Sequence, residues 1–109
     1  MNSWKDLQDA IIKFRNERDW KQFHNPKDLA LALSIEASEL NELYLWKKPE
    51  EADIEKVKSE LADVLSYALL LADAYDLDIP KLFKEKLEIS GEKYPVDRAR
   101  GTAKKYNEL

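Results

Sequence analysis

Apolar residues recur at spacings of three and four along most of the chain, a pattern typical of amphipathic helices that pack against one another. With the helix-start residues Ser3, Asn25 and Asp78, this pattern predicts four helices. They are expected over residues 3–18, 26–46, 49–75 and 80–91. Only two glycines and four prolines are present, too few turn-forming residues for a many-stranded sheet. The predicted fold is an all-α bundle of four main helices.

The same spacing predicts which residues of each helix face inward. The first helix is expected to pack through Leu7, Ala10, Ile11 and Phe14. The second presents Leu29, Leu33, Glu36, Leu40 and Leu43. The third presents Val57, Glu60, Leu61, Val64, Ala68 and Leu71. Acidic residues therefore occupy positions in two buried stripes.

These acids form two pairs, Glu36 with Glu39 and Glu60 with Asp63. Residues three apart project from one face of a helix, so two antiparallel helices would bring four carboxylates together. Carboxylates in a low-dielectric interior are costly unless they are neutralised, paired or bound to metal. Clusters of oxygen ligands suit hard divalent cations. The pairs predict a Mg²⁺ site, with Mn²⁺ as a possible substitute.

Other interpretations of the acids remain open from the pattern alone. Any one acidic pair at this spacing is also typical of a solvated helix face. A di-iron bundle requires Glu-x-x-His pairs, and the only histidine, His24, is outside both pairs. A non-catalytic helical interaction module, in which the acids form salt bridges with lysine and arginine, is the second hypothesis.

Composition narrows the class of protein. The chain of 109 residues fits one domain, and so small a domain gains from a partner subunit that completes its core. Absence of cysteine excludes disulfides, zinc–cysteine sites and thiol catalysis, and suits a reducing cytoplasm. No apolar run reaches the roughly 20 residues needed to span a bilayer, and the N-terminus lacks a signal-peptide core. We expect a soluble cytoplasmic protein without a membrane partner.

A third hypothesis, nucleic-acid binding, concerns the basic residues near the C-terminus. They are Arg98, Arg100, Lys104 and Lys105. The net charge of −4 disfavours this hypothesis, because phosphate backbones are bound through positive charge. No nucleic-acid partner is expected.

The acidic motifs are also the basis of a family resemblance. The order Glu36-x-x-Glu39, twenty residues, then Glu60-x-x-Asp63 resembles the signature of the all-α nucleoside triphosphate pyrophosphatases that include MazG. Further motifs resemble the dCTP pyrophosphatase branch: Glu17–Pro26, Leu45-Trp46, Leu61–Tyr67, Asp78-Ile-Pro80, and Lys93-Tyr-Pro95 through Leu109. Nearly the whole chain is covered, which implies one MazG-like domain over residues 1–109.

The resemblance implies hydrolysis of a nucleoside triphosphate between the α and β phosphates, giving monophosphate and pyrophosphate with Mg²⁺. The four acids would hold the metal and orient a water for in-line attack. Glu39 is the first choice for the general base, and Glu42 is the second. Two substrate ranges stay open: dCTP or related dNTPs, and the broad range of a housecleaning enzyme.

The resemblance also implies the groups that bind the nucleotide. They are Trp20, His24, Trp46, Tyr67, Lys86, Ser90 and Tyr94. The aromatic residues would stack on the base and sugar, and Lys86 with Tyr94 would contact phosphates or sugar. Taken without the resemblance, each aromatic is equally well explained as core packing, and Lys86 is better explained as solvated surface.

Two positions depart from the family pattern. Family members commonly have asparagine in place of Ser90, so a direct contact is expected to become water-mediated. Vertebrate-type dCTP enzymes have histidine in place of Ile11, which cannot form a hydrogen bond. The resemblance implies assembly as a homotetramer built from two dimers, with a dimer as the fallback. Residues of the aromatic segment would then reach a neighbour's metal site.

Overall fold

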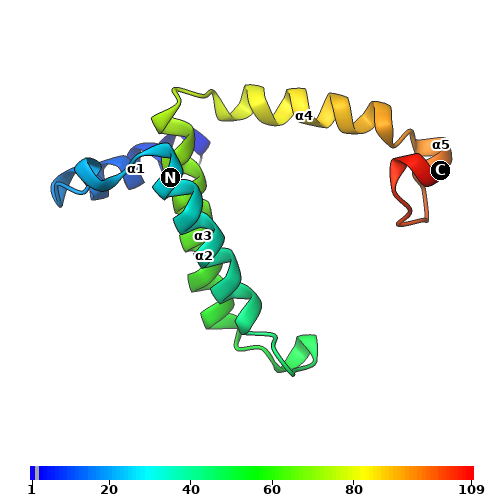
Figure 1. The fold of residues 1–109 in the computed structure, drawn as a ribbon, viewed down its shortest axis with the longest axis horizontal. Coiled ribbons are helices and arrows are strands. Elements are labelled where there is room, and N and C mark those ends of the chain that lie inside the picture. Colours follow the sequence, from blue (N-terminus) through cyan, green and yellow to red (C-terminus); the bar gives the residue numbers. More distant parts are fainter. Residues whose placement is uncertain (2) are drawn as a thin grey trace. The chain divides into compact units, whose positions relative to one another are not determined.

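The computed structural model describes residue 1 and residues 3–109, and every regular element in that part is helical (Figure 1). The chain forms two compact units, Met1–Leu77 and Asp78–Leu109. The all-α prediction is confirmed for the described residues. The prediction of a single domain stays a prediction.

The first unit is built around a helical hairpin. Helices α2 (Pro26–Glu42) and α3 (Ile54–Ala74) run antiparallel, side by side, as Figure 1 shows. Helix α1 (Trp4–Glu17) packs against α3. The connections contain the 3₁₀ turns η1 (Lys21–Phe23) and η2 (Pro49–Glu51). The hairpin thus places residues of α2 opposite residues of α3.

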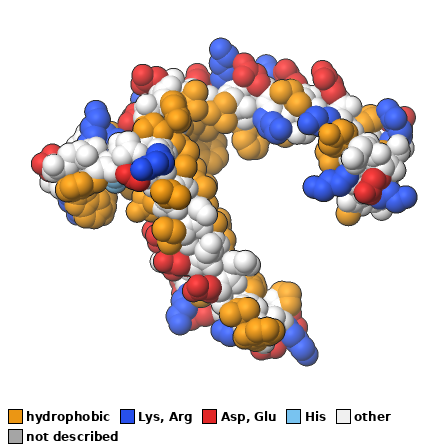
Figure 2. Space-filling model, in the orientation of Figure 1, with side chains coloured by type: hydrophobic (Ala, Val, Ile, Leu, Met, Phe, Trp, Pro, Cys, Tyr) orange, Lys and Arg blue, Asp and Glu red, His pale blue; other side chains and the backbone are white. Residues whose placement is uncertain are grey.

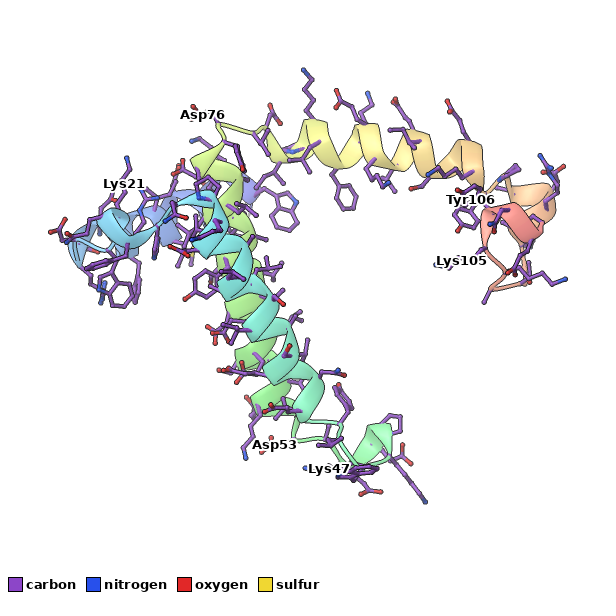
Figure 3. All side chains as sticks on the ribbon, in the orientation of Figure 1. Lys21, Lys47, Asp53, Asp76, Lys105 and Tyr106 are labelled. Atoms are coloured by element: carbon purple, nitrogen blue, oxygen red, sulfur yellow. The ribbon has the colours of Figure 1, made fainter. Side chains whose placement is uncertain are left out.

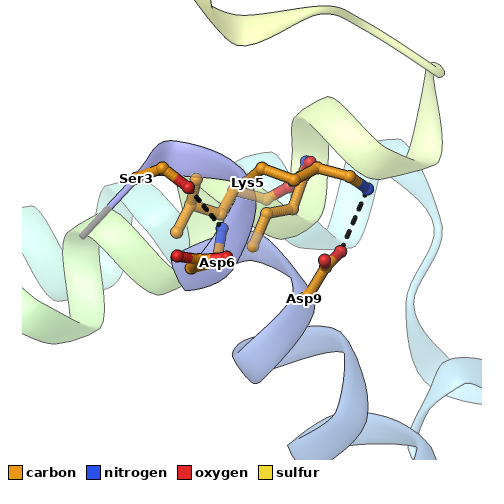
Figure 4. Close-up of polar contacts among 6 residues, drawn as sticks. Ser3, Lys5, Asp6 and Asp9 are labelled. Carbon is orange, nitrogen blue, oxygen red and sulfur yellow. Dashed lines mark hydrogen bonds and ion pairs between the residues drawn. The ribbon is translucent and has the colours of Figure 1, made fainter. Parts of the chain in front are cut away.

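Side-chain caps fix where the helices begin. Ser3 Oγ accepts a hydrogen bond from the backbone N–H of Asp6 at 3.1 Å, as Figure 4 shows beside the Lys5–Asp9 ion pair. Asn25 Oδ1 accepts from the N–H of Asp28 at 2.9 Å. The predicted cap at Asp78 also forms, accepting from Lys81 at 3.0 Å, and an unpredicted one forms at Asp53. Each such cap stabilises its helix by about 1 kcal/mol.

The predicted end of the second helix at Trp46 is wrong by one turn, because α2 ends at Glu42. Beyond it the backbone tightens: the N–H of Tyr44 donates to Asn41 and that of Leu45 to Glu42. Trp46 then adopts a left-handed conformation with φ 62°. A bulky residue rarely takes this conformation, so the sequence does not predict it.

The predicted start of the third helix at Pro49 is also wrong. Residues Pro49–Glu51 form only a 3₁₀ turn, and Ala52 is extended with ψ 140°. Asp53 caps α3 from outside, through a hydrogen bond from the N–H of Glu55 to Asp53 Oδ1 at 3.0 Å. Figure 3 labels Lys47 and Asp53 on either side of this connection.

Buried side chains are concentrated where α1, α2 and α3 meet. The buried hydrophobic residues of the described chain are Leu29, Leu69, Leu70 and Ala72. The predicted stripe of α3 is wrong at Leu61 and Ala68, which are exposed. Helix α3 contacts both α1 and α2, so its C-terminal half buries a wider face than one stripe. On α1, Leu7, Ala10 and Phe14 also remain exposed within this chain.

Two polar contacts connect α1 to α3. Gln8 Nε2 donates to the carbonyl oxygen of Leu69 at 3.1 Å. Arg15 Nη1 forms an ion pair with Asp73 Oδ2 at 3.1 Å, and the side chain of Arg15 is 5% exposed. A charged side chain this deeply buried requires such a partner. These two contacts connect α1 to α3 near both ends of α1.

The second unit comprises α4 (Ile79–Lys93), α5 (Val96–Ala99) and the 3₁₀ turn η3 (Tyr106–Glu108). Tyr94 packs edge-to-face against Tyr106, with ring centroids 6.2 Å apart. Lys93 Nζ lies 5.0 Å from the centroid of the same Tyr106 ring. These contacts hold the C-terminal turn near the end of α4.

Many large hydrophobic side chains remain exposed in both units, and Figure 2 shows them at the surface. In the first unit an apolar groove of about 340 Å³ runs between α1 and α3, and Trp4, Leu7 and Leu65 are among its lining residues. In α4 the exposed residues include Leu82, Phe83 and Leu87. No described helix is both long and apolar enough to cross a membrane.

Candidate metal centre and nucleotide pocket

Three of the predicted metal-binding acids lie together across the α2–α3 hairpin. Glu36 projects from α2, while Glu60 and Asp63 project from α3. One carboxylate oxygen from each residue lies within 4.8 Å of the others. Acids 24 and 27 positions apart in the sequence therefore converge because the two helices are antiparallel.

Two of these acids have an oxygen that the protein leaves unsatisfied. Glu36 and Glu60 are half-buried, and the Oε2 atom of each is buried without a hydrogen-bond partner among the described residues. Asp63 is more exposed. Buried polar atoms normally have partners, so two carboxylate oxygens without one in the same cluster fit a site that holds a cation.

The environment of the cluster favours protonation when no cation is bound. Burial raises the pKa of Glu36 to about 7, and hydrogen bonding to Glu39 and the negative charges of Glu39 and Asp63 add to this effect. Burial also raises the pKa of Glu60, with the charge of Glu39 as the next cause. A divalent cation would offset both effects, because its positive charge favours the ionised carboxylates.

The fourth predicted ligand, Glu39, lies one turn beyond Glu36 on the same helix. It is exposed and is not part of the three-residue cluster, but its carboxyl group acts on both Glu36 and Glu60. Glu42 lies at the end of α2 and lines a different pocket. The structure thus brings Glu39 beside the cluster and leaves Glu42 outside it.

The donor set fits a hard divalent cation. All donors are carboxylate oxygens, the ligand type preferred by Mg²⁺ and Mn²⁺. Among the described residues, none of the four acids forms an ion pair with lysine or arginine. The salt bridges expected of a non-catalytic interaction module are therefore not formed within this part of the chain.

A pocket of about 330 Å³ lies beside the acids, and Asp63 belongs to both features. The residues that line it are Ile11, Phe14, Arg15, Trp20, His24, Asp63, Ser66, Tyr67 and Leu70. Three predicted nucleotide-binding residues, Trp20, His24 and Tyr67, are thus brought together with one predicted metal ligand. The pocket is large enough for a planar heterocycle.

We call this pocket the aromatic pocket. Aromatic contacts and a turn shape one of its walls. The rings of Phe14 and Trp20 meet edge-to-face at 5.9 Å, and the guanidinium carbon of Arg18 lies 3.6 Å from the Phe14 centroid. Asp19 takes a left-handed conformation between them, with φ 54°. Aspartate tolerates this conformation, so the chain reverses after α1 and returns Trp20 toward that helix.

His24 contributes a polar atom to the aromatic pocket. Its Nδ1 is buried and lacks a hydrogen-bond partner among the described residues. Burial lowers the pKa of His24, and the positive charge of Arg15 lowers it further. The lowered pKa favours the neutral imidazole, and the described residues leave the hydrogen bond of Nδ1 unmade.

Arg15 is a residue of the aromatic pocket that the sequence analysis did not identify. Its partner Asp73 is 58 positions away, so the pairing has no local sequence signal. The available signal was its position: Leu7, Ile11 and Arg15 are four apart and share one face of α1. A charged residue in line with apolar ones is a candidate for a buried functional group.

Trp46 lies apart from the aromatic pocket in this chain. It lines a second pocket of about 540 Å³ at the end of α2, with Ser38, Asn41, Glu42, Tyr44 and Leu45. Its side chain is 94% exposed. An exposed tryptophan on a left-handed backbone is costly and suits a residue that meets another molecule.

The remaining predicted binding residues belong to the second unit. Lys86 is exposed on α4, Ser90 is half-buried on the same helix, and Tyr94 packs against Tyr106. The second unit by itself therefore contains none of the clustered acids or pocket aromatics described above.

The chain is similar in sequence and in fold to known proteins. A family model described as MazG-like matches residues 31–109. The chain is 37% identical over 113 residues to dCTP pyrophosphatase 1 of Rattus norvegicus and of Homo sapiens, with 96% of this chain aligned. It spans 66% of the length of these relatives. A pyrophosphatase from Archaeoglobus fulgidus superposes with a TM-score of 0.74 and 36% identity, covering 84% of this chain and 91% of that one.

Proposed function

The chain belongs to the MazG-like family, and on that premise we propose that it hydrolyses nucleoside triphosphates to the monophosphate and pyrophosphate. The observation that carries the proposal is the pair of orphaned carboxylate oxygens, on Glu36 and Glu60, beside a pocket that shares Asp63. The arrangement offers a cation site and a base site in direct contact. A nucleoside triphosphate presents matching groups, a phosphate chain and a planar base.

In this proposal Glu36, Glu39, Glu60 and Asp63 hold Mg²⁺, with Mn²⁺ as a substitute. The cation would neutralise charge on the phosphate oxygens as the bond between the α and β phosphates breaks. Glu39 is the proposed general base, since it is exposed beside the cluster and can accept a proton from an attacking water. Glu42 is the second choice, because it lies one turn farther from the cluster.

The aromatic pocket is proposed to bind the base and sugar. Trp20 and Tyr67 offer ring faces for stacking, and the Nδ1 atom of neutral His24 offers a hydrogen-bond acceptor. The relatives named dCTP pyrophosphatase 1 support dCTP as the first substrate to test. A broader range of dNTPs is the alternative, because Ile11 itself contributes no hydrogen-bonding group to the pocket.

We propose a homotetramer as the active assembly, with a dimer as the fallback, in the cytoplasm. The support is the apolar groove between α1 and α3 and the exposed apolar residues of α4, both of which a second copy could cover. Assembly is also proposed to bring Trp46, Lys86, Ser90 and Tyr94 to a nucleotide. Trp46 in particular is exposed enough to reach a neighbouring subunit.

The experiment that tests the activity is product analysis. The purified protein is incubated with each dNTP and NTP, with Mg²⁺ or with EDTA, and monophosphate is resolved from diphosphate by chromatography. The proposal expects monophosphate and pyrophosphate only when Mg²⁺ is present. Diphosphate and phosphate as products, or no turnover of any nucleotide, would contradict it.

A further inference from the structure

Arg15 is the one buried cation of the aromatic pocket, and the proposed reaction gives it no part. It lines the pocket together with His24, Trp20 and Tyr67. Its side chain is 95% buried, and it belongs to α1, whereas the acids belong to α2 and α3. Burial of a guanidinium is costly, so a residue at this place requires a physical account.

The ion pair with Asp73 accounts for only part of the guanidinium. Nη1 donates to Asp73 Oδ2 at 3.1 Å, and Nε donates to Asn16 Oδ1 at 3.0 Å. Nη2, which has two N–H groups, has no partner among the described residues. The buried polar atoms without a partner do not include Nη2. Since Nη2 has no partner, it must belong to the small accessible surface of Arg15.

The two partners restrict how the remaining donors can point. Asn16 and Asp73 hold two of the three nitrogens of a planar group, so the orientation of Nη2 is fixed in advance. The other polar atom nearby, His24 Nδ1, lacks a partner as well. The lining of the pocket therefore includes a guanidinium held by two partners and a histidine nitrogen between aromatic walls, a combination suited to the edge of a nucleobase.

We infer that Arg15 determines base specificity by donating a hydrogen bond from Nη2 to a carbonyl oxygen of the nucleobase. The inference rests on the proposed function and deepens it by naming the class of base. Cytosine, thymine, uracil and guanine have an exocyclic carbonyl oxygen, whereas adenine has none. Adenine would cover this donor without supplying an acceptor, and a donor that becomes buried without a partner is a strong basis for rejection.

The test compares kcat/KM for dCTP and dATP in the wild type and in two variants. The Arg15→Met/Asp73→Asn double variant removes the donor without leaving a carboxylate unpaired. We expect the ratio of dCTP to dATP to fall by about 10- to 100-fold, as for loss of a hydrogen bond from a charged group. Lys13→Met is the matched control, because it removes an exposed cation from the same helix, and it should leave the ratio unchanged.

A purely structural role for Arg15 predicts a different result. The double variant would then have a lower melting temperature and an unchanged substrate ratio, which would overturn the inference. A substrate-side comparison covers the case in which the double variant does not fold. On the wild type, kcat/KM for dITP should exceed kcat/KM for the triphosphate of purine 2′-deoxyriboside by about tenfold or more, because that purine lacks the C6 carbonyl and, with it, the N1 proton. Equal kcat/KM values for these two substrates would overturn the inference.

Binding measurements separate this inference from the proposed function. Calorimetry with the α,β-methylene analogues of dCTP and dATP needs no turnover. If the wild type binds the dCTP analogue preferentially, the double variant loses this preference and dCTP is not hydrolysed, the function is overturned and the role of Arg15 is supported. Hydrolysis with a ratio that does not respond to Arg15 would overturn the inference alone. Absence of both binding and hydrolysis would overturn both.

Discussion

A single carboxyl group, that of Glu36, shows how the site favours occupation by a cation. Its place on the α2 face that meets α3 half-buries it, and three other acids act on its carboxyl group. The folded chain without metal therefore holds a proton on Glu36 at pH values where an unfolded chain would release it. At neutral pH the ionised acids lower the stability of the folded chain without metal. A divalent cation bound to the same acids would raise that stability.

The raised pKa of Glu36 predicts a pH-dependent stability. Between its ordinary value of 4.5 and about 7, the folded state binds more protons than the unfolded state. The free energy of unfolding without metal should therefore fall as pH rises through this window. Thermal melts in EDTA across the window check this, with Glu36→Gln as the control that removes the contribution. A wild type that gains stability relative to Glu36→Gln as pH rises would contradict the prediction.

Metal affinity should show the complementary dependence. Because a bound cation displaces the proton from Glu36, the affinity for Mg²⁺ should rise with pH below about 7, by up to about tenfold per pH unit for one displaced proton. Calorimetric titration in two buffers with different ionisation enthalpies measures the number of protons released. No proton release at about pH 6 would argue that the cation binds elsewhere.

The helices show which structural features local sequence signals can predict. All four main helices were predicted, because their apolar spacing and their caps at Ser3, Asn25 and Asp78 are local signals. The end of α2 was not, since the left-handed backbone of Trp46 has no local signal in a bulky residue. The start of α3 was displaced because a proline can open a 3₁₀ turn as well as a helix.

At the level of the α2 helix, we expect its N-cap to affect both stability and substrate binding. Asn25 caps α2 directly after His24, so loss of the cap should loosen the turn that places His24 in the pocket. Asn25→Ala should reduce the free energy of unfolding by about 1 kcal/mol and raise KM more than it lowers kcat. Asn25→Ser retains a capping oxygen and should restore both quantities. Equal effects of alanine and serine would contradict this account.

Packing of α2 in the core depends on Leu29, which is 2% exposed. Leu29→Ala should reduce the free energy of unfolding by about 2–5 kcal/mol, because it removes buried methyl groups and leaves a cavity. Leu31→Ala is the matched control on the same helix, since Leu31 is 55% exposed. Urea denaturation of the two variants measures the difference. Similar losses for both would mean that Leu29 is not in the core.

At the scale of the whole molecule, the sequence predicted which acids lie together more completely than it predicted which residues line the aromatic pocket. Glu36, Glu60 and Asp63 could be paired because helical spacing and an antiparallel hairpin bring them together. The pairing of Arg15 with Asp73 could not be predicted from the sequence, because it depends on how α1 packs on α3. The exposed apolar groove between those helices is a property that only the folded chain displays.

That groove leads to a prediction about assembly. If a second copy covers it, Leu65→Arg should dissociate the assembly, since burying an unpaired charge is costly. Ser59→Arg introduces the same side chain at an exposed position of α3 and is the matched control. Sedimentation velocity compares the two variants. An unchanged sedimentation coefficient for Leu65→Arg would place the interface elsewhere.

The central claim is that the carboxylates across the α2–α3 hairpin hold the cation used in hydrolysis. Mg²⁺-dependent release of pyrophosphate from dCTP by Glu60→Gln tests it most directly, compared with Glu55→Gln, which changes an exposed acid of the same helix. With both variants folded by circular dichroism, Glu60→Gln should lose at least about 100-fold in kcat, while Glu55→Gln stays near the wild type. Full turnover by a folded Glu60→Gln variant would contradict the account.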